Sequence, residues 1–165
     1  MVIAGTNGEA ATLKLHEKVA LARRLREVAN SLSRPALTIT VGCNGGCTRD
    51  VVDDTEAMHD AGADYALVLV PSYFHFAMNQ QAIVSFFQEV ADTSPLPVVI
   101  YNFPSVVAGL DVNSEMLAIL GAHRNIVAVK LTCGGIAKVA RVANQYKPEE
   151  FSALAGQSDC RWLVC

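Results

Sequence analysis

The chain has 165 residues, of which 52% are hydrophobic and 18% are charged, and its formal net charge is -3. This balance excludes an intrinsically disordered chain, and the lack of a basic excess argues against nucleic-acid binding. No apolar run reaches the roughly 18 residues that a membrane-spanning helix needs, so we expect no membrane partner. The five cysteines are odd in number and scattered, which favours reduced thiols in a cytoplasmic protein. A mitochondrial protein is the alternative if an N-terminal extension carries a targeting signal.

Apolar strands alternate with amphipathic helices along the chain. The predicted strands cover residues 2–4, 36–41, 65–70, 98–101, 126–130 and 151–155. The predicted helices cover residues 12–32, 48–61, 79–91, 114–120 and 136–146, and we expect Thr48 to cap the second of them. Each strand is almost wholly apolar, which predicts a parallel sheet that is covered on both faces. This pattern leaves two architectures, an open doubly wound sheet and a closed eight-stranded barrel.

Polar residues and glycines follow the carboxyl ends of the predicted strands, where both architectures place their active sites. Lys130 closes an apolar strand, and burial disfavours the ammonium form of its side chain. A neutral amine attacks a ketone and forms a Schiff base. The structural alternative is a lysine that extends to solvent or pairs with a carboxylate. Tyr101 ends the preceding strand and is placed either to relay a proton or to pack with a single hydrogen bond.

The glycine-rich turn at residues 5–8 offers backbone N–H groups and the hydroxyl of Thr6 near the start of a helix. Such a turn can hold a carboxylate or phosphate, or it can be an ordinary connection between a strand and a helix. It matches neither a P-loop nor a dinucleotide-binding fingerprint. The four histidines show no metal-ligand spacing, so we expect no metal and no cofactor.

Four motifs together resemble one family. They are Gly5-Thr6-Asn7-Gly8-Glu9, Pro71-Ser72-Tyr73, Tyr101-Asn102-Phe103-Pro104 and Ile126-Val127-Ala128-Val129-Lys130. Their order and spacing resemble the dihydrodipicolinate synthase and N-acetylneuraminate lyase family of pyruvate-dependent class I aldolases. The resemblance implies a (β/α)₈ TIM barrel. Because such a barrel typically needs about 250 residues, residues 1–165 are expected to form a partial catalytic domain that contains strands two to seven.

The resemblance also implies roles for single residues. Lys130 matches the lysine that forms the Schiff base with a 2-keto acid, and Tyr101 matches the tyrosine that relays protons. Thr6 and Asn7 match the pair that binds the keto-acid carboxylate, with Thr6 also helping to orient the tyrosine. Gly156 matches a glycine that lines the pocket. The protonated imine is an electron sink, which allows an adjacent carbanion to persist as an enamine.

A further residue match concerns assembly. Tyr73 matches a tyrosine that, in the synthases, lies near the active site of a neighbouring subunit. The family usually forms homotetramers built from dimers, so the resemblance implies a dimer or tetramer for the full-length form.

Three departures bear on the substrate. The synthases usually carry an arginine two residues after the proline of the tyrosine motif, where it binds aspartate semialdehyde, and Val106 stands there instead. Leu131 directly follows Lys130, at a position where the family often carries an acidic or similarly polar residue. Asn7 is typical of 4-hydroxy-2-oxoglutarate aldolases, and residues 130–135 resemble fungal aldolases that split 2-keto-3-deoxy-hexonates.

We therefore predict an aldolase that cleaves a 4-hydroxy-2-keto acid, such as a 2-keto-3-deoxy sugar acid or 4-hydroxy-2-oxoglutarate, to pyruvate and an aldehyde. One alternative is 4-hydroxy-tetrahydrodipicolinate synthase, which condenses pyruvate with aspartate semialdehyde. Alternatives of other classes are a non-catalytic truncated remnant of such an enzyme, and an open doubly wound sheet that binds a small anion at residues 5–8. The tail at residues 160–165 does not resemble the expected continuation.

Overall fold

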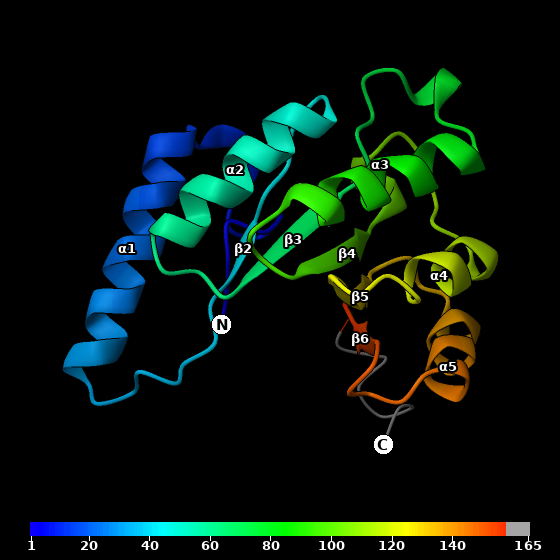
Figure 1. Cartoon of the computed structure of the whole chain (residues 1–165). Helices are drawn as coiled ribbons and strands as arrows, with labels where there is room; N and C mark the ends of the chain where they lie inside the picture. The colour runs from blue at the N-terminus through cyan, green and yellow to red at the C-terminus, as the bar shows by residue number, and fades with distance from the viewer. Residues whose placement is uncertain (158–165) are drawn as a thin grey trace.

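The computed structural model describes residues 1–157, in which six strands alternate with five α-helices (Figure 1). The strands are β1 (Val2–Ile3), β2 (Thr40–Gly42), β3 (Tyr65–Leu69), β4 (Val98–Asn102), β5 (Ile126–Leu131) and β6 (Ser152–Ala155). The α-helices are α1 (Leu15–Ser31), α2 (Thr48–Asp60), α3 (Gln80–Thr93), α4 (Ser114–Leu120) and α5 (Ile136–Gln145). Short 3₁₀ helices cover Ala10–Thr12, His75–Ala77 and Pro104–Val106. Cys160, Cys165 and the expected tail lie outside the described residues.

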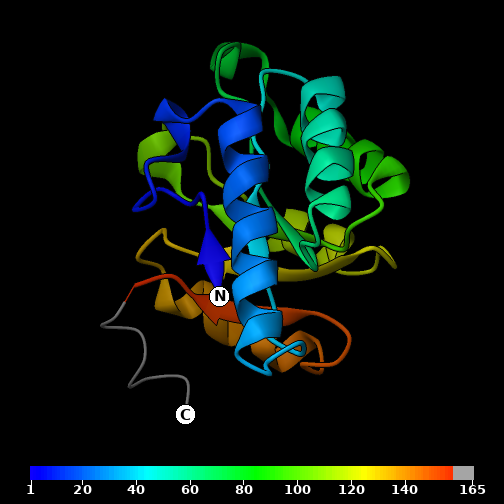
Figure 2. The ribbon, with the colours of Figure 1, turned by 90° about the vertical axis from the view of Figure 1, so that its left-hand side faces the viewer.

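The six strands form one parallel sheet in the order β1-β2-β3-β4-β5-β6. Each strand therefore pairs with the next one along the chain, whereas a doubly wound sheet reverses direction at a switch point. The sheet curls, and the helices lie along its outer side, with α1 and α2 side by side (Figures 1 and 2). The arrangement confirms the expected partial (β/α)₈ barrel and excludes the open doubly wound sheet.

Alternate residues of each strand pack on opposite faces of the sheet. The larger core lies between the sheet and the helices, and includes Val68, Ile100 and Phe87. A smaller cluster covers the concave face and consists of Leu67, Val99, Tyr101 and Ala128, with partly buried neighbours. Tyr101 therefore packs on the concave face, and the next residue of β4 packs on the helix-covered face. Within residues 1–157 no helix combines the length and apolar composition that a bilayer crossing requires.

The second strand is shorter than predicted because side chains satisfy the backbone before it. The Arg26 guanidinium donates hydrogen bonds to the carbonyl oxygens of Pro35 and Leu37, each at 3.0 Å. The backbone N–H of Ile39 donates to a carboxylate oxygen of Asp64 at 2.7 Å. This stretch therefore reaches the sheet without strand pairing, and the strand begins at Thr40 rather than at residue 36.

The start of the first helix and the cap of the second also differ from the prediction. The first α-helix begins at Leu15 rather than at residue 12, because a 3₁₀ turn precedes it. The predicted cap at Thr48 is wrong, since Cys47 takes the N-cap position and Thr48 is the first helical residue. The Thr48 hydroxyl donates instead to Glu89 on α3 at 3.1 Å, so it links two helices.

Candidate active site

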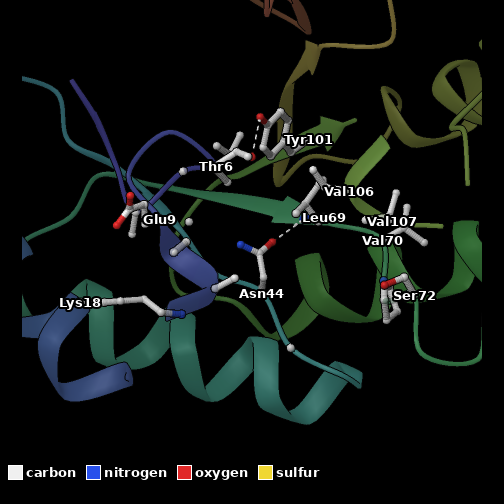
Figure 3. Close-up of a pocket in the computed structure, with 18 residues that line it drawn as sticks. Thr6, Glu9, Lys18, Asn44, Leu69, Val70, Ser72, Tyr101, Val106 and Val107 are labelled. Carbon is white, nitrogen blue, oxygen red and sulfur yellow. Dashed lines mark hydrogen bonds between the residues drawn. The ribbon is translucent and has the colours of Figure 1, made fainter. Parts of the chain in front are cut away.

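The carboxyl ends of the strands bring three predicted site residues together. Tyr101 on β4 and Lys130 on β5 are register partners on adjacent strands. The Lys130 Nζ lies 4.1 Å from the centre of the Tyr101 ring, in cation–π contact. Thr6, in the turn after β1, places its hydroxyl 3.1 Å from the Tyr101 hydroxyl, and Figure 3 shows these two side chains pointing toward each other. A hydroxyl pair and an amine therefore share one end of the partial barrel.

Lys130 forms no ion pair with a carboxylate in the described part of the chain. It is half-buried. Its nearest described partner is the face of an aromatic ring, which is only 3% exposed. The geometry disfavours the lysine–carboxylate pair that the sequence left open.

A cavity of about 360 Å³ lies beside this group. Thr6 and Tyr101 line it on one side, and the apolar side chains of Val106 and Val107 line it on another, together with Ser72 (Figure 3). Its volume falls within the range of roughly 300–1,000 Å³ that is typical of small-molecule sites. Lys130 does not itself line the cavity, but its Nζ contacts the ring of Tyr101, which does.

The other predicted site residues lie outside this cavity. Asn7 is exposed in the turn after β1. Gly156 follows β6, where a Cβ atom would overlap the Thr132 hydroxyl and the Leu131 carbonyl. Tyr73 lies in the loop after β3 and is 79% exposed. None of the three appears among the residues that line the cavity.

Thr132 is a further residue close to Lys130, and the sequence assigned no role to it. It lies two positions after Lys130, next to Gly156, and its backbone N–H donates to the Asn102 carbonyl at 2.9 Å. Its hydroxyl is the buried side-chain polar group without a hydrogen-bond partner in the described part of the chain. Leaving a buried hydroxyl unsatisfied costs about 1–3 kcal/mol. The position of Thr132 just after a predicted strand is a signal that the sequence offers. The lack of a hydrogen-bond partner for its hydroxyl is visible only in the structure.

Asn44 and Gly42 position the rim between β2 and β3. The Asn44 Oδ1 accepts a hydrogen bond of 2.8 Å from the Leu69 backbone N–H, which ties the turn after β2 to the end of β3 (Figure 3). At Gly42 a Cβ atom would overlap the Ala4 carbonyl, so only glycine lets β1 approach this closely. The sequence did not single out either residue.

A buried ion pair borders the cavity through Lys18. The Lys18 Nζ, which lines the cavity, is 3.3 Å from a carboxylate oxygen of Asp54. Burial raises the pKa of Asp54, while the charge and hydrogen bond of Lys18 oppose the shift. Burial, aided by the Asp54 charge, raises the pKa of the Cys43 thiol to about 12. Cys43 is therefore a thiol at neutral pH and not a nucleophile.

No group of three or more His, Cys, Asp or Glu side chains within residues 1–157 is arranged to hold a metal ion. The chemistry that the described residues offer is that of an amine, two neighbouring hydroxyls and backbone N–H groups. Within residues 1–157 the backbone N–H groups of Thr6 and Asn7 donate no hydrogen bond, whereas those of Gly8 and Glu9 bond within the turn. The two free donors and the Thr6 hydroxyl are suited to an anionic group.

Comparison with known proteins identifies close relatives. The sequence profile of the Dihydrodipicolinate synthetase family matches residues 1–163. A protein of Emericella nidulans that carries the name "Probable 4-hydroxy-2-oxoglutarate aldolase, mitochondrial" is 37% identical over 96% of this chain and 51% of its own length. The L-threo-3-deoxy-hexylosonate aldolase of Hypocrea jecorina is 38% identical over 87% of this chain and 45% of its own length.

Solved structures show the same fold. The chloride-inhibited dihydrodipicolinate synthase of Acinetobacter baumannii, solved in complex with pyruvate, superposes with a TM-score of 0.87 and 26% identity. The match covers 99% of this chain and 53% of the synthase. The chain spans about half the length of the curated relatives that it matches.

Proposed function

The chain belongs to the Dihydrodipicolinate synthetase family, and on that premise we propose that it carries the Schiff-base centre of an aldolase. The proposed reaction is the cleavage of a 4-hydroxy-2-keto acid to pyruvate and an aldehyde. The observation that carries the proposal is the contact of Lys130 with Tyr101, whose hydroxyl is paired with Thr6. An amine, a proton relay and an anion-binding turn are the three parts that this chemistry needs.

Lys130 is the proposed nucleophile. Its neutral amine attacks the C2 ketone. Tyr101 then donates its phenolic proton to the carbinolamine hydroxyl, which leaves as water, so that a protonated imine and a Tyr101 phenolate result. Tyr101 accepts the proton of the C4 hydroxyl as the C3–C4 bond breaks and the aldehyde departs. The electron pair of that bond moves into the imine and leaves an enamine. Protonation at C3 and hydrolysis of the imine then release pyruvate and regenerate the amine.

The turn after β1 is the proposed carboxylate site. The unused backbone N–H groups of Thr6 and Asn7 supply two donors for the substrate carboxylate. The Thr6 hydroxyl helps to orient Tyr101 through the hydrogen bond that joins them. Gly156 is the proposed pocket glycine by its match to the family, and the absence of a side chain there leaves room for the Thr132 hydroxyl.

Val106 favours the cleavage of hydroxy-keto acids over the synthase reaction. Its apolar side chain lines the cavity at the position where the synthases usually carry an arginine. A second carboxylate, such as that of aspartate semialdehyde, finds no guanidinium partner there. The names of the relatives in Emericella nidulans and Hypocrea jecorina suggest 4-hydroxy-2-oxoglutarate or a 3-deoxy-hexylosonate as substrates to test.

The proposed assembly is a homo-oligomer, either a dimer or a tetramer. Tyr73 is exposed on the loop after β3, as a residue that reaches a neighbouring subunit must be. A cytoplasmic location stays a prediction. The name of the Emericella nidulans relative includes the word mitochondrial, so a mitochondrial location stays the alternative prediction.

The proposed function is tested by measuring pyruvate release from a panel of 4-hydroxy-2-keto acids, with aspartate semialdehyde plus pyruvate as the competing reaction. We predict that Tyr101→Phe lowers kcat by about 100-fold or more, because the proton relay is lost. Tyr146→Phe is the matched control, since the Tyr146 hydroxyl donates to the Ala118 carbonyl on the helix-covered side. Faster condensation with aspartate semialdehyde than cleavage of any panel member would show that the substrate assignment is wrong. Equal kcat for Tyr101→Phe and the wild-type chain would remove Tyr101 from the mechanism.

A further inference from the structure

The end of β4 carries a buried amide that binds a distant part of the chain. Asn102 is 1% exposed and packs on the helix-covered face of the sheet. Its Oδ1 accepts a hydrogen bond of 3.0 Å from the Val112 backbone N–H, and its Nδ2 donates to a carboxylate oxygen of Asp111 at 2.8 Å. Asn102 therefore holds the chain nine and ten residues downstream of itself.

A lysine from α5 binds the same two residues. The Lys138 Nζ donates to both carboxylate oxygens of Asp111, at 2.6 and 2.8 Å, and to the Val112 carbonyl at 2.9 Å. Lys138 is buried, so its three donors are used within the protein. We refer to Asn102, Asp111 and Lys138 as the anchor network.

The anchor network joins both ends of one loop. Residues 103–110 leave the sheet directly after Asn102 and return at Asp111, which Asn102 also binds. Within the loop, the backbone N–H groups of Val107 and Gly109 donate to the Pro104 carbonyl at 3.1 and 2.9 Å. The loop is therefore a compact turn whose two ends are fixed by one amide and one ammonium group.

This loop supplies one wall of the cavity. Val106 and Val107 line it, and Val107 is buried while Val106 is partly exposed. Tyr101, the residue before Asn102, lines the same cavity (Figure 3). Asn102 and Tyr101 point to opposite faces of β4, so the amide of Asn102 contacts the end of the loop from the face opposite Tyr101.

We propose that the Lys138–Asp111–Asn102 anchor network is a positioning device that sets the 103–110 loop, and with it the Val106–Val107 wall, against Tyr101. The substrate part of this inference rests on the proposed function, because Val106 and Val107 line the cavity that the proposed substrate would enter. Lys138 touches no substrate and acts through the loop. Its loss loosens the wall but leaves the amine of Lys130 and the turn after β1 in place.

Hydrogen exchange of the 165-residue chain tests the device without relying on turnover. In Lys138→Met, the backbone amides of residues 106–110 are expected to exchange about tenfold faster than in the wild-type chain. Asp111→Asn is the second variant, because it keeps the shape of the side chain and removes the charge. Lys138→Arg restores donors to Asp111 and is expected to restore slow exchange. Arg141→Met is the matched control on α5, since Arg141 bonds to Ser114 at the surface.

Kinetics then separate positioning from general structural damage. Lys138→Met is expected to raise KM for the cleaved 4-hydroxy-2-keto acid about tenfold with kcat nearly unchanged, and Lys138→Arg to recover the wild-type KM. Wild-type exchange rates for residues 106–110 in both Lys138→Met and Asp111→Asn would overturn the proposal, as would an equal loss in Arg141→Met. If the wild-type chain forms no imine with pyruvate, the proposed function fails, and the exchange experiment still decides whether the network sets the loop.

Discussion

The Thr132 hydroxyl is a buried polar group that forms no hydrogen bond within the described residues. It lies beside Gly156 and two residues beyond the proposed nucleophile. Buried polar groups are hydrogen-bonded in most folded proteins, so an unpaired one is commonly a group that awaits a ligand or a water molecule. We expect Thr132 to face the substrate once the imine has formed on Lys130.

Thr132→Val tests this expectation. The replacement has nearly the same shape, so we predict that the free energy of unfolding is unchanged or rises by about 1 kcal/mol, because the unsatisfied hydroxyl is removed. At the same time KM for the substrate is expected to increase. Thr55→Val is the matched control, since the buried Thr55 hydroxyl donates to the Val52 carbonyl at 2.8 Å and its loss should destabilise the chain.

Urea unfolding and steady-state kinetics measure the two effects separately. If Thr132→Val were destabilised as strongly as Thr55→Val, the hydroxyl of Thr132 would have a partner within the folded chain, which would contradict its assignment to the substrate.

The sequence was sufficient to place Lys130 and Tyr101 at one rim, because both end apolar strands and parallel strands end on the same side. It did not predict the partners of Asn102 and Lys138, which are 36 residues apart along the chain. Both side chains bind Asp111 because the fold brings α5 close to the end of β4. A short sequence motif does not encode that arrangement.

Helices α1 and α2 are held together by the buried pair of Lys18 and Asp54. Burial raises the pKa of Asp54, so the folded state disfavours the ionised carboxylate. For this group the contribution to stability is fully present below the pKa of the unfolded chain and is lost as the pH rises through the folded pKa. Lys18 limits the loss at neutral pH by compensating the charge.

We predict that Lys18→Met lowers the free energy of unfolding by about 3 kcal/mol at pH 7, because an unpaired carboxylate then stays buried. The loss is expected to be smaller at about pH 4, where the Asp54 carboxyl binds a proton in the folded state. The double variant Lys18→Met/Asp54→Asn should recover most of the stability. Urea unfolding at the two pH values measures the effect, and an equal loss at both would show that Asp54 does not carry it.

At the scale of elements, periodicity located the five α-helices and the six strands of the described residues, but it missed the 3₁₀ helices and misjudged several ends. The start of β2 depends on Arg26 and Asp64, which bind the backbone before the strand from distant positions. The capping of α2 differs from the prediction because the Thr48 hydroxyl bonds to Glu89 on α3 rather than to the backbone of its own helix. Both outcomes are decided by tertiary contacts, which outweigh local preference at element ends.

At the scale of the whole molecule, the feature that bears on assembly is an exposed aromatic cluster in the loop after β3. The rings of Tyr73 and Phe74 lie 4.9 Å apart, those of Phe74 and Phe76 lie 6.1 Å apart, and all three side chains are exposed. Contiguous apolar surface of this kind is typical of an interface. This cluster is the surface that we expect to join subunits in the proposed homo-oligomer.

We predict that Phe76→Asp shifts the chain toward the monomer, since a carboxylate would be buried in the contact. Sedimentation equilibrium over a range of protein concentrations measures the change. Ile119→Asp is the control, because Ile119 is an exposed apolar residue on α4, away from the aromatic loop. Association that is unaffected by Phe76→Asp, or equally weakened by Ile119→Asp, would place the interface elsewhere.

The partial barrel brings together Lys130, Tyr101 and the proposed carboxylate-binding turn, and the central claim is that this group forms an imine with a 2-keto acid. Incubation of the chain with pyruvate, reduction with borohydride and peptide mass analysis test it directly. The account predicts one adduct, equal to pyruvate minus water plus two hydrogens, on the peptide that contains Lys130, and none in Lys130→Arg because a guanidinium is not a usable nucleophile. An unmodified Lys130 in folded, soluble protein would contradict the claim.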